Sequence, residues 1–91
     1  MAPKPRRIVR TTEFDEQCAA LGPVDRMDEA LEAVEWAIAT NPDVFPVVVG
    51  TKVRVAKMHI EPPLRIAFEF NDETAVLLEI ERVPLDDMGL P

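Results

Sequence analysis

Hydrophobic and polar residues alternate over residues 64–82, which read LRIAFEFNDETAVLLEIER. The apolar positions are Leu64, Ile66, Phe68 and Phe70 before a polar break at residues 71–74, and Val76, Leu78 and Ile80 after it. A period of two is typical of a strand with one buried face, so this stretch predicts an antiparallel hairpin. An isolated hairpin is barely stable in water, and the preceding residues must therefore cover its apolar side.

The first helical pattern lies in residues 12–21. Phe14, Cys18 and Leu21 are spaced so that they share one side of a short helix. A T-x-x-D pattern starts at Thr12, whose hydroxyl is the expected acceptor for a free amide of the first turn. On this basis Cys18 is expected to be a core residue.

A longer amphipathic helix is predicted over residues 25–40, with Asp25 as its N-cap and Pro42 just beyond its end. Its apolar stripe consists of Met27, Ala30, Leu31, Val34, Ala37 and Ile38. Such a stripe is typical of a helix that lies on a sheet. We expect Met27, Leu31, Val34 and Ile38 to pack on Ile66, Phe68, Leu78 and Ile80.

Two further strands complete the predicted fold. Residues 6–11 and residues 52–58 have strand-like patterns, and the prolines at 62 and 63 place a turn before the hairpin. The element order is therefore β-α-α-β-β-β. It predicts an α+β domain in which two N-terminal helices pack on one face of a small antiparallel sheet.

Length and composition favour a single domain. The 91 residues are divided into a flexible end at 1–5, one domain at 6–83 and a tail at 84–91. No apolar run is long enough for a membrane span, so no membrane contact is expected. The single cysteine excludes an internal disulfide and indicates the cytoplasm, a reducing compartment.

Composition also removes several kinds of chemistry. The chain has no serine and no tyrosine, and its one histidine and one cysteine cannot form the usual zinc site. Its three glycines form no phosphate-binding loop, so no metal and no cofactor is expected. The net charge of −7 argues against non-specific binding of nucleic acid by the whole molecule. However, acidic residues gather in the predicted helices, and basic ones at the start of the chain and in the predicted sheet.

Several short motifs occur in the order and at the spacing found in one family. They are TTEF at residues 11–14, Asn41-Pro42 at the end of the second helix, Gly50 before the second strand, LRIAF at 64–68 and VLLEIER at 76–82. With these motifs, most of the chain resembles the RelE/ParE superfamily of bacterial toxins from toxin–antitoxin pairs. The resemblance implies a cognate antitoxin as partner. It also implies one of two targets, messenger RNA on the ribosome or DNA gyrase.

For the RNA-cleaving members, the resemblance implies a basic site on the sheet. A ribose hydroxyl attacks the adjacent phosphate, and cations stabilise the charge that develops. The matching positions are Lys52, Arg54, Arg65 and Arg82 as catalytic cations, with Lys52, Arg54, Lys57 and Arg65 as RNA-binding residues. The C-terminal tyrosine or histidine of active members has no counterpart, because Leu85 stands at that place.

Alternation predicts the face from which these cations project. If Ile66, Phe68, Val53 and Val55 face the helices, then Lys52, Arg54 and Arg65 share the open side. Glu69, Glu79 and Glu81 share it too, so ordinary pairing between strands is the alternative to a phosphate site. His59 is either a catalytic acid or a loop residue.

Two further classes of function stay open. The missing acid and the net charge favour a non-catalytic relative that serves as a protein-interaction module, whereas gyrase inhibition needs no acid. Exposed large apolar groups can mark interfaces, so Trp36 and Leu90 are candidates for a partner surface. An α+β domain with an unrelated binding role is the third interpretation.

Overall fold

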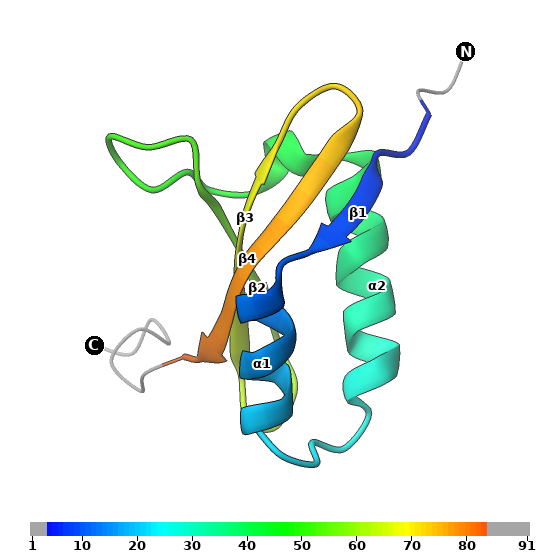
Figure 1. Ribbon diagram of the computed structural model, residues 1–91, viewed down its shortest axis with the longest axis vertical. Coiled ribbons are helices and arrows are strands. Elements are labelled where there is room, and N and C mark those ends of the chain that lie inside the picture. Colours follow the sequence, from blue (N-terminus) through cyan, green and yellow to red (C-terminus); the bar gives the residue numbers. More distant parts are fainter. Residues whose placement is uncertain (1–3, 84–91) are drawn as a thin grey trace.

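A computed structural model of the chain describes residues 4–83. Its elements are β1 (Arg7–Arg10), α1 (Thr12–Ala20), α2 (Met27–Thr40), the 3₁₀ turn η1 (Pro42–Val44), β2 (Arg54–Met58), β3 (Leu64–Phe70) and β4 (Thr74–Arg82) (Figure 1). This order confirms the predicted β-α-α-β-β-β succession and the α+β class. No helix among these residues is long and apolar enough to cross a membrane. The expected tail at 84–91, with Leu85 and Leu90, and most of the expected flexible end at 1–5 lie outside the described residues.

The four strands form a mixed sheet in the order β1-β4-β3-β2. β2, β3 and β4 are antiparallel neighbours, as predicted, but β1 pairs with β4 in parallel, so the prediction of a purely antiparallel sheet is wrong. A parallel neighbour requires a long crossover, which here comprises both helices, β2 and β3. Both helices lie on one side of the sheet and leave the other side, the open face, without a helix (Figure 1).

The core lies between the helices and the sheet. Its members are the buried residues Phe14, Leu31, Ile38, Ala56, Met58, Leu64, Ile66, Phe68, Ala75, Leu77 and Ile80. Met27, Val34 and Cys18 are partly buried against them. The expected packing of α2 on the sheet is therefore confirmed, except at Leu78.

A β-bulge in β4 explains that exception. Ala67 lies opposite Glu79, but Phe68 lies opposite Leu77, so Leu78 is an extra residue that no β3 residue faces. One extra residue inverts the alternation of a strand. As a result Leu77 is fully buried, whereas Leu78, the predicted core residue, is only half-buried.

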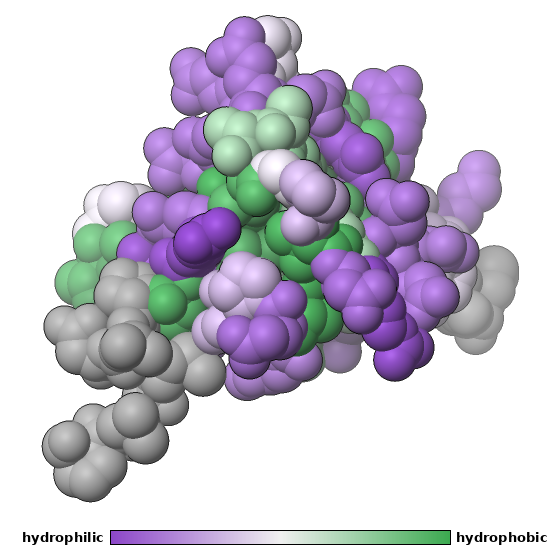
Figure 2. Space-filling model, turned by 90° about the horizontal axis from the view of Figure 1, so that it is seen from below, coloured by the Kyte–Doolittle hydropathy of each residue, from purple (hydrophilic) through white to green (hydrophobic). Residues whose placement is uncertain are grey.

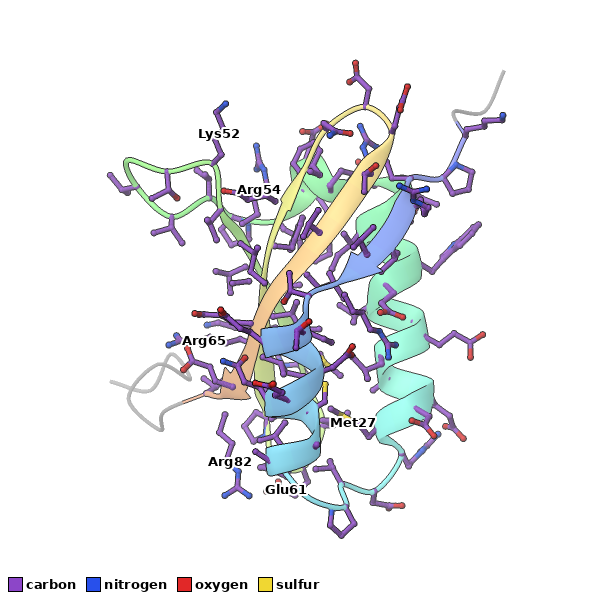
Figure 3. All side chains as sticks on the ribbon, viewed as in Figure 1. Met27, Lys52, Arg54, Glu61, Arg65 and Arg82 are labelled. Carbon is purple, nitrogen blue, oxygen red and sulfur yellow. The ribbon has the colours of Figure 1, made fainter. Side chains whose placement is uncertain are left out.

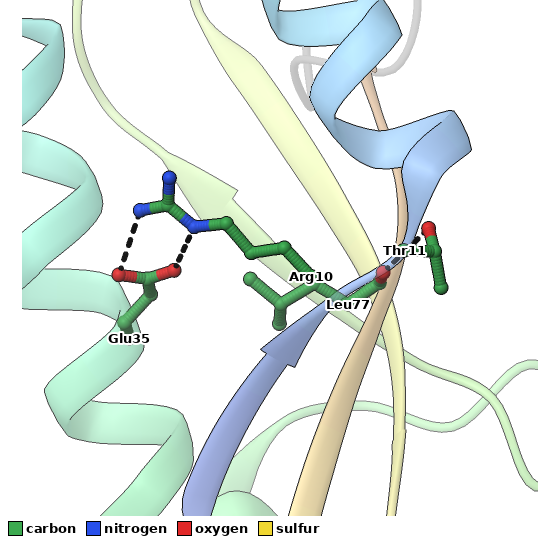
Figure 4. A network of polar contacts seen from close by, with 4 residues as sticks. All are labelled: Arg10, Thr11, Glu35 and Leu77. Carbon is green, nitrogen blue, oxygen red and sulfur yellow. Dashed lines mark hydrogen bonds and ion pairs between the residues drawn. The ribbon is translucent and has the colours of Figure 1, made fainter.

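The N-cap of α1 is Thr11 rather than the predicted Thr12. The Thr11 hydroxyl accepts a hydrogen bond from the Phe14 amide at 3.1 Å. It also donates to the Leu77 carbonyl oxygen at 3.0 Å (Figure 4). The Leu78 carbonyl oxygen lies 3.3 Å from the same hydroxyl. Either threonine could cap the helix locally, and this second bond, at the bulge in β4, distinguishes them.

The start of α2 also differs from the prediction. The helix begins at Met27, and the residue before it is Arg26, in the left-handed conformation with φ at 62° and no side-chain cap. Asp25 is therefore not its N-cap. Arg26 instead forms an ion pair with Glu29 in the first turn at 3.0 Å. Asn41 and Pro42 end the helix as predicted.

An ion pair joins β1 to α2. Arg10 Nε donates to Glu35 Oε2 at 2.8 Å, and Arg10 Nη2 donates to Glu35 Oε1 at 3.1 Å (Figure 4). The hydrogen bond with Glu35 raises the pKa of the Arg10 guanidinium above its usual value. The pair links the longer helix to the short edge strand.

Candidate functional site

The cations that the resemblance assigns to a phosphate site lie at separate places along the sheet. Lys52 lies in the loop before β2, Arg54 begins β2, Arg65 lies in β3 and Arg82 ends β4 (Figure 3). Whether they can act together depends on the face from which each projects and on the groups that each already contacts.

Arg54 projects toward the helix side of the sheet, so the prediction that it shares the open face with Arg65 is wrong. It lies opposite the buried Phe68 in the pairing of β2 with β3. The next inward positions on β2 are Ala56 and Met58, which are buried.

The inverted parity of β2 has a physical reason. Both sides of this strand carry apolar residues, Val53 and Val55 on one side and Ala56 and Met58 on the other, so alternation alone does not select the inner side. Alanine leaves room for α2 to approach the sheet, whereas a valine at the same place would hold the helix away. Val53 and Val55 are half-buried on the open face instead.

Arg54 is held by several groups near η1. Its Nη1 donates to the carbonyl oxygens of Phe45 at 2.7 Å and Asp43 at 3.3 Å, and its Nη2 lies 4.0 Å from the Asp43 carboxylate. Its guanidinium lies 5.5 Å from the centre of the Phe70 ring, which Arg6 contacts at 5.1 Å. These contacts give Arg54 a structural role in connecting β2, η1 and β3. No local pattern in the sequence indicates this cluster, because it joins residues from four separate segments.

Arg65 projects from the open face, as predicted. It forms an ion pair with Glu81, its neighbour in β4, with Arg65 Nε at 2.7 Å and Nη2 at 2.6 Å from Glu81 Oε1. Pairing between strands was the alternative to a phosphate site, and of the acidic residues expected on this face, Glu69, Glu79 and Glu81, it is Glu81 that pairs with Arg65. Lys57 lies directly opposite Arg65 on β2, and these are the two predicted cations that the sheet brings together.

Arg82 is remote from this pair. It lies opposite Leu64, a core residue, and therefore on the helix side at the end of β4. There it borders a hollow together with Gln17 and Leu21 of the α1 region. The structure thus places Arg54 and Arg82 on the helix side of the sheet and Arg65 on the open face, while Lys52 lies in the loop before β2.

His59 lies at the end of the molecule where the α1–α2 and β2–β3 connections meet. Figure 2 looks onto this end and shows apolar surface between hydrophilic side chains. A hollow of about 490 Å³ lies here, lined by Asp25, Arg26, Glu29, Ala30, His59, Ile60 and Glu61. It does not include Arg65, so His59 is not placed as an acid for chemistry at that residue.

The open face carries a second hollow, which the alternation pattern does not predict. Its volume is about 280 Å³, and we call it the open-face hollow. It is lined by Val48, Val53, Val55, Arg65, Ala67, Glu79 and Glu81. The cation-bearing site expected here therefore has an apolar floor and two carboxylates. The run of three valines before Gly50 was the available signal in the sequence.

The chain's one cysteine, Cys18, is a further reactive group. Burial raises the pKa of the Cys18 thiol, and Arg10 partly offsets this effect. Among residues 4–83, no group of three histidine, cysteine or acidic side chains could hold a metal ion. Trp36 is 63% exposed on α2, which leaves its predicted role at a partner surface open.

Neither a scan against protein-family models nor a search of curated proteins finds a match for this chain. Cations on opposite faces cannot converge on one phosphate, and the arginine on the open face already has a carboxylate partner. This arrangement suits binding better than RNA cleavage.

Proposed function

We propose that this protein is a RelE/ParE-like toxin that stops bacterial growth by binding its target, DNA gyrase, without cleaving RNA. A cognate antitoxin neutralises it. The proposal draws on the order of the motifs along the chain and on the β-α-α-β-β-β succession. The separation of the expected catalytic cations is the observation that favours target binding over RNA cleavage. Arg54 is bound to backbone oxygens on the helix side, while Arg65 is paired with Glu81 on the open face.

Induced expression in a bacterium tests this proposal with three readouts, namely growth, the supercoiling of a plasmid and the 5′ ends of cellular messenger RNAs. The wild-type chain is expected to stop growth and relax the plasmid while creating no new RNA ends. Coexpression with a short neighbouring reading frame that encodes the antitoxin should restore growth.

Two variants sharpen the experiment. Arg65→Ala removes the arginine of the open face, and Arg26→Asn removes an exposed arginine elsewhere with a residue that tolerates the left-handed conformation. New RNA ends that disappear in Arg65→Ala but persist in Arg26→Asn would contradict the non-cleaving mode and support a ribonuclease. Normal growth with unchanged supercoiling and translation would contradict the toxin proposal itself.

The second candidate is a non-catalytic RelE-like module that binds a protein partner and has no effect on growth. The observation that favours it is the apolar floor of the open-face hollow, where a ribonuclease needs cations. Undisturbed growth on expression, together with a stable complex with another protein, is the expected result for this candidate.

A further inference from the structure

The loop at residues 46–53, here called the valine loop, exposes apolar side chains from a well-defined backbone. Val47 is 48% exposed, Val48 is 44% exposed and Val49 is 95% exposed. Large exposed apolar groups that gather in one segment mark interaction surfaces more often than single ones do. The loop projects beyond the sheet on the side away from the helices (Figure 1).

Hydrogen bonds fix this loop. The Val48 amide donates to the Val53 carbonyl at 2.8 Å, and the Val55 amide donates to the Pro46 carbonyl at 3.0 Å. The Thr51 hydroxyl donates to the Val48 carbonyl at 2.8 Å and accepts from the Val53 amide at 3.1 Å. A surface that is already ordered loses little conformational entropy when a partner binds. The valine loop therefore has the properties of a preorganised wall.

The loop and the sheet together enclose the open-face hollow. Val48 of the valine loop lines it together with an apolar floor of Val53, Val55 and Ala67, of which Val55 and Ala67 lie opposite each other in the sheet. The volume of the open-face hollow, about 280 Å³, lies just below the range of about 300–1,000 Å³ that is usual for small-molecule sites. It is therefore the right size for side chains of a peptide and too small for a typical cofactor.

The charges at the rim define the second requirement for a ligand. Glu81 is neutralised by Arg65, but Glu79 forms no ion pair with any residue in the described range 4–83. Glu79 lies opposite Ala67, which in turn lies opposite Val55, so the carboxylate borders the apolar floor directly. An approaching basic side chain would find a partner there without displacing another.

We infer that the open-face hollow binds an extended segment of a partner protein in which an aliphatic residue and a lysine or arginine stand two positions apart. Residues at i and i+2 of an extended segment project on the same side, about 6.6 Å apart. The aliphatic side chain enters between Val48 and the floor, and the basic one reaches from there to Glu79. The inference rests on this hollow alone and holds whether or not the protein inhibits growth.

A selection from phage-displayed random octapeptides on the immobilised full chain tests this inference. The wild-type chain is expected to enrich peptides with the aliphatic-x-basic spacing. The same selection on Glu79→Lys should instead enrich peptides that have aspartate or glutamate at the position of the basic residue. A peptide selected on the wild type should bind Glu79→Lys about tenfold more weakly in fluorescence anisotropy, and Val48→Ser similarly.

The matched control is Glu32→Lys, the same charge reversal at an exposed position of α2 that does not line the hollow. It changes the net charge equally and should change the peptide affinity less than about twofold. The inference is overturned if the wild type enriches no motif, or if Glu79→Lys and Glu32→Lys weaken binding equally. It is also overturned if sedimentation shows a wild-type dimer that Val48→Ser dissociates, since the occupant would then be a second copy of the chain.

Discussion

Thr11 connects the start of α1 with the bulge of β4, and its replacement by alanine gives a sharp test of the fold. Its hydroxyl accepts from the Phe14 amide at 3.1 Å and donates to the Leu77 carbonyl at 3.0 Å. Loss of an N-cap costs about 1 kcal/mol, and a further hydrogen bond contributes about 0.5–1.5 kcal/mol. The Leu77 carbonyl keeps the backbone amide of Thr11 as a donor at 3.1 Å, so no buried acceptor is left without a partner.

We therefore expect Thr11→Ala to lower the free energy of unfolding by about 1.5–2.5 kcal/mol. In a domain of this size that corresponds to a fall in melting temperature of about 6–20 °C. Urea denaturation followed by circular dichroism measures the first quantity and a thermal scan the second. Thr11→Ser keeps both hydrogen bonds and should lose less than half as much.

Thr12→Ala is the decisive comparison, because Thr12 is the cap that the sequence predicts and the structure shows it exposed within the helix. Its cost should stay below about 0.5 kcal/mol. If Thr12→Ala destabilised the protein as much as Thr11→Ala, or if Thr11→Ala cost less than about 0.5 kcal/mol, the assignment of the cap and its tie to β4 would be refuted.

Further variants test the core of the sheet, one ion pair and the partly buried thiol. Leu77→Ala should cost about 2–5 kcal/mol and Leu78→Ala under half of that in urea denaturation, because the bulge buries only the former; the reverse order would contradict the bulge. Arg10→Gln should cost no more than about 1 kcal/mol, since the Arg10 side chain that pairs with Glu35 is 43% exposed, and 1 M salt should reduce the difference from the wild type. Burial raises the pKa of the Cys18 thiol, so the native state holds its proton more tightly than the unfolded chain does. The stability that this provides is complete below the unfolded pKa and is lost as pH rises through the native pKa, so the wild type should lose more stability than Cys18→Ala above about pH 8.5.

Much of the fold could be predicted because short sequence patterns determine which segments form helices and strands and which side of each faces the core. The alternation in residues 64–70 identifies a strand with Leu64, Ile66 and Phe68 on its inner side, and all three are fully buried. The helical spacing of Leu31 and Ile38 correctly predicts which side of α2 enters the core. Pro42 marks the end of that helix because the residue before a proline is disfavoured in helical geometry.

The candidate site was harder to predict, since it depends on how strands lie against one another. Arg65 projects from the open face as expected because its neighbours on both sides in β3 are strongly apolar. Arg54 does not, because β2 has apolar residues on both sides and only packing under α2 selects the inner one. The ion pair of Arg65 with Glu81, rather than with Glu79, follows from the register between β3 and β4.

The sequence by itself thus determines the kind and order of the elements and the inner side of β3 and α2, because periodicity and turn residues act over a few neighbouring positions. Tertiary structure decides the parallel pairing of β1, the bulge at Leu78, the cap at Thr11 and the inner side of β2. Each of these depends on contacts between segments distant in the chain, such as the bond from Thr11 to Leu77, whose energies no local pattern contains.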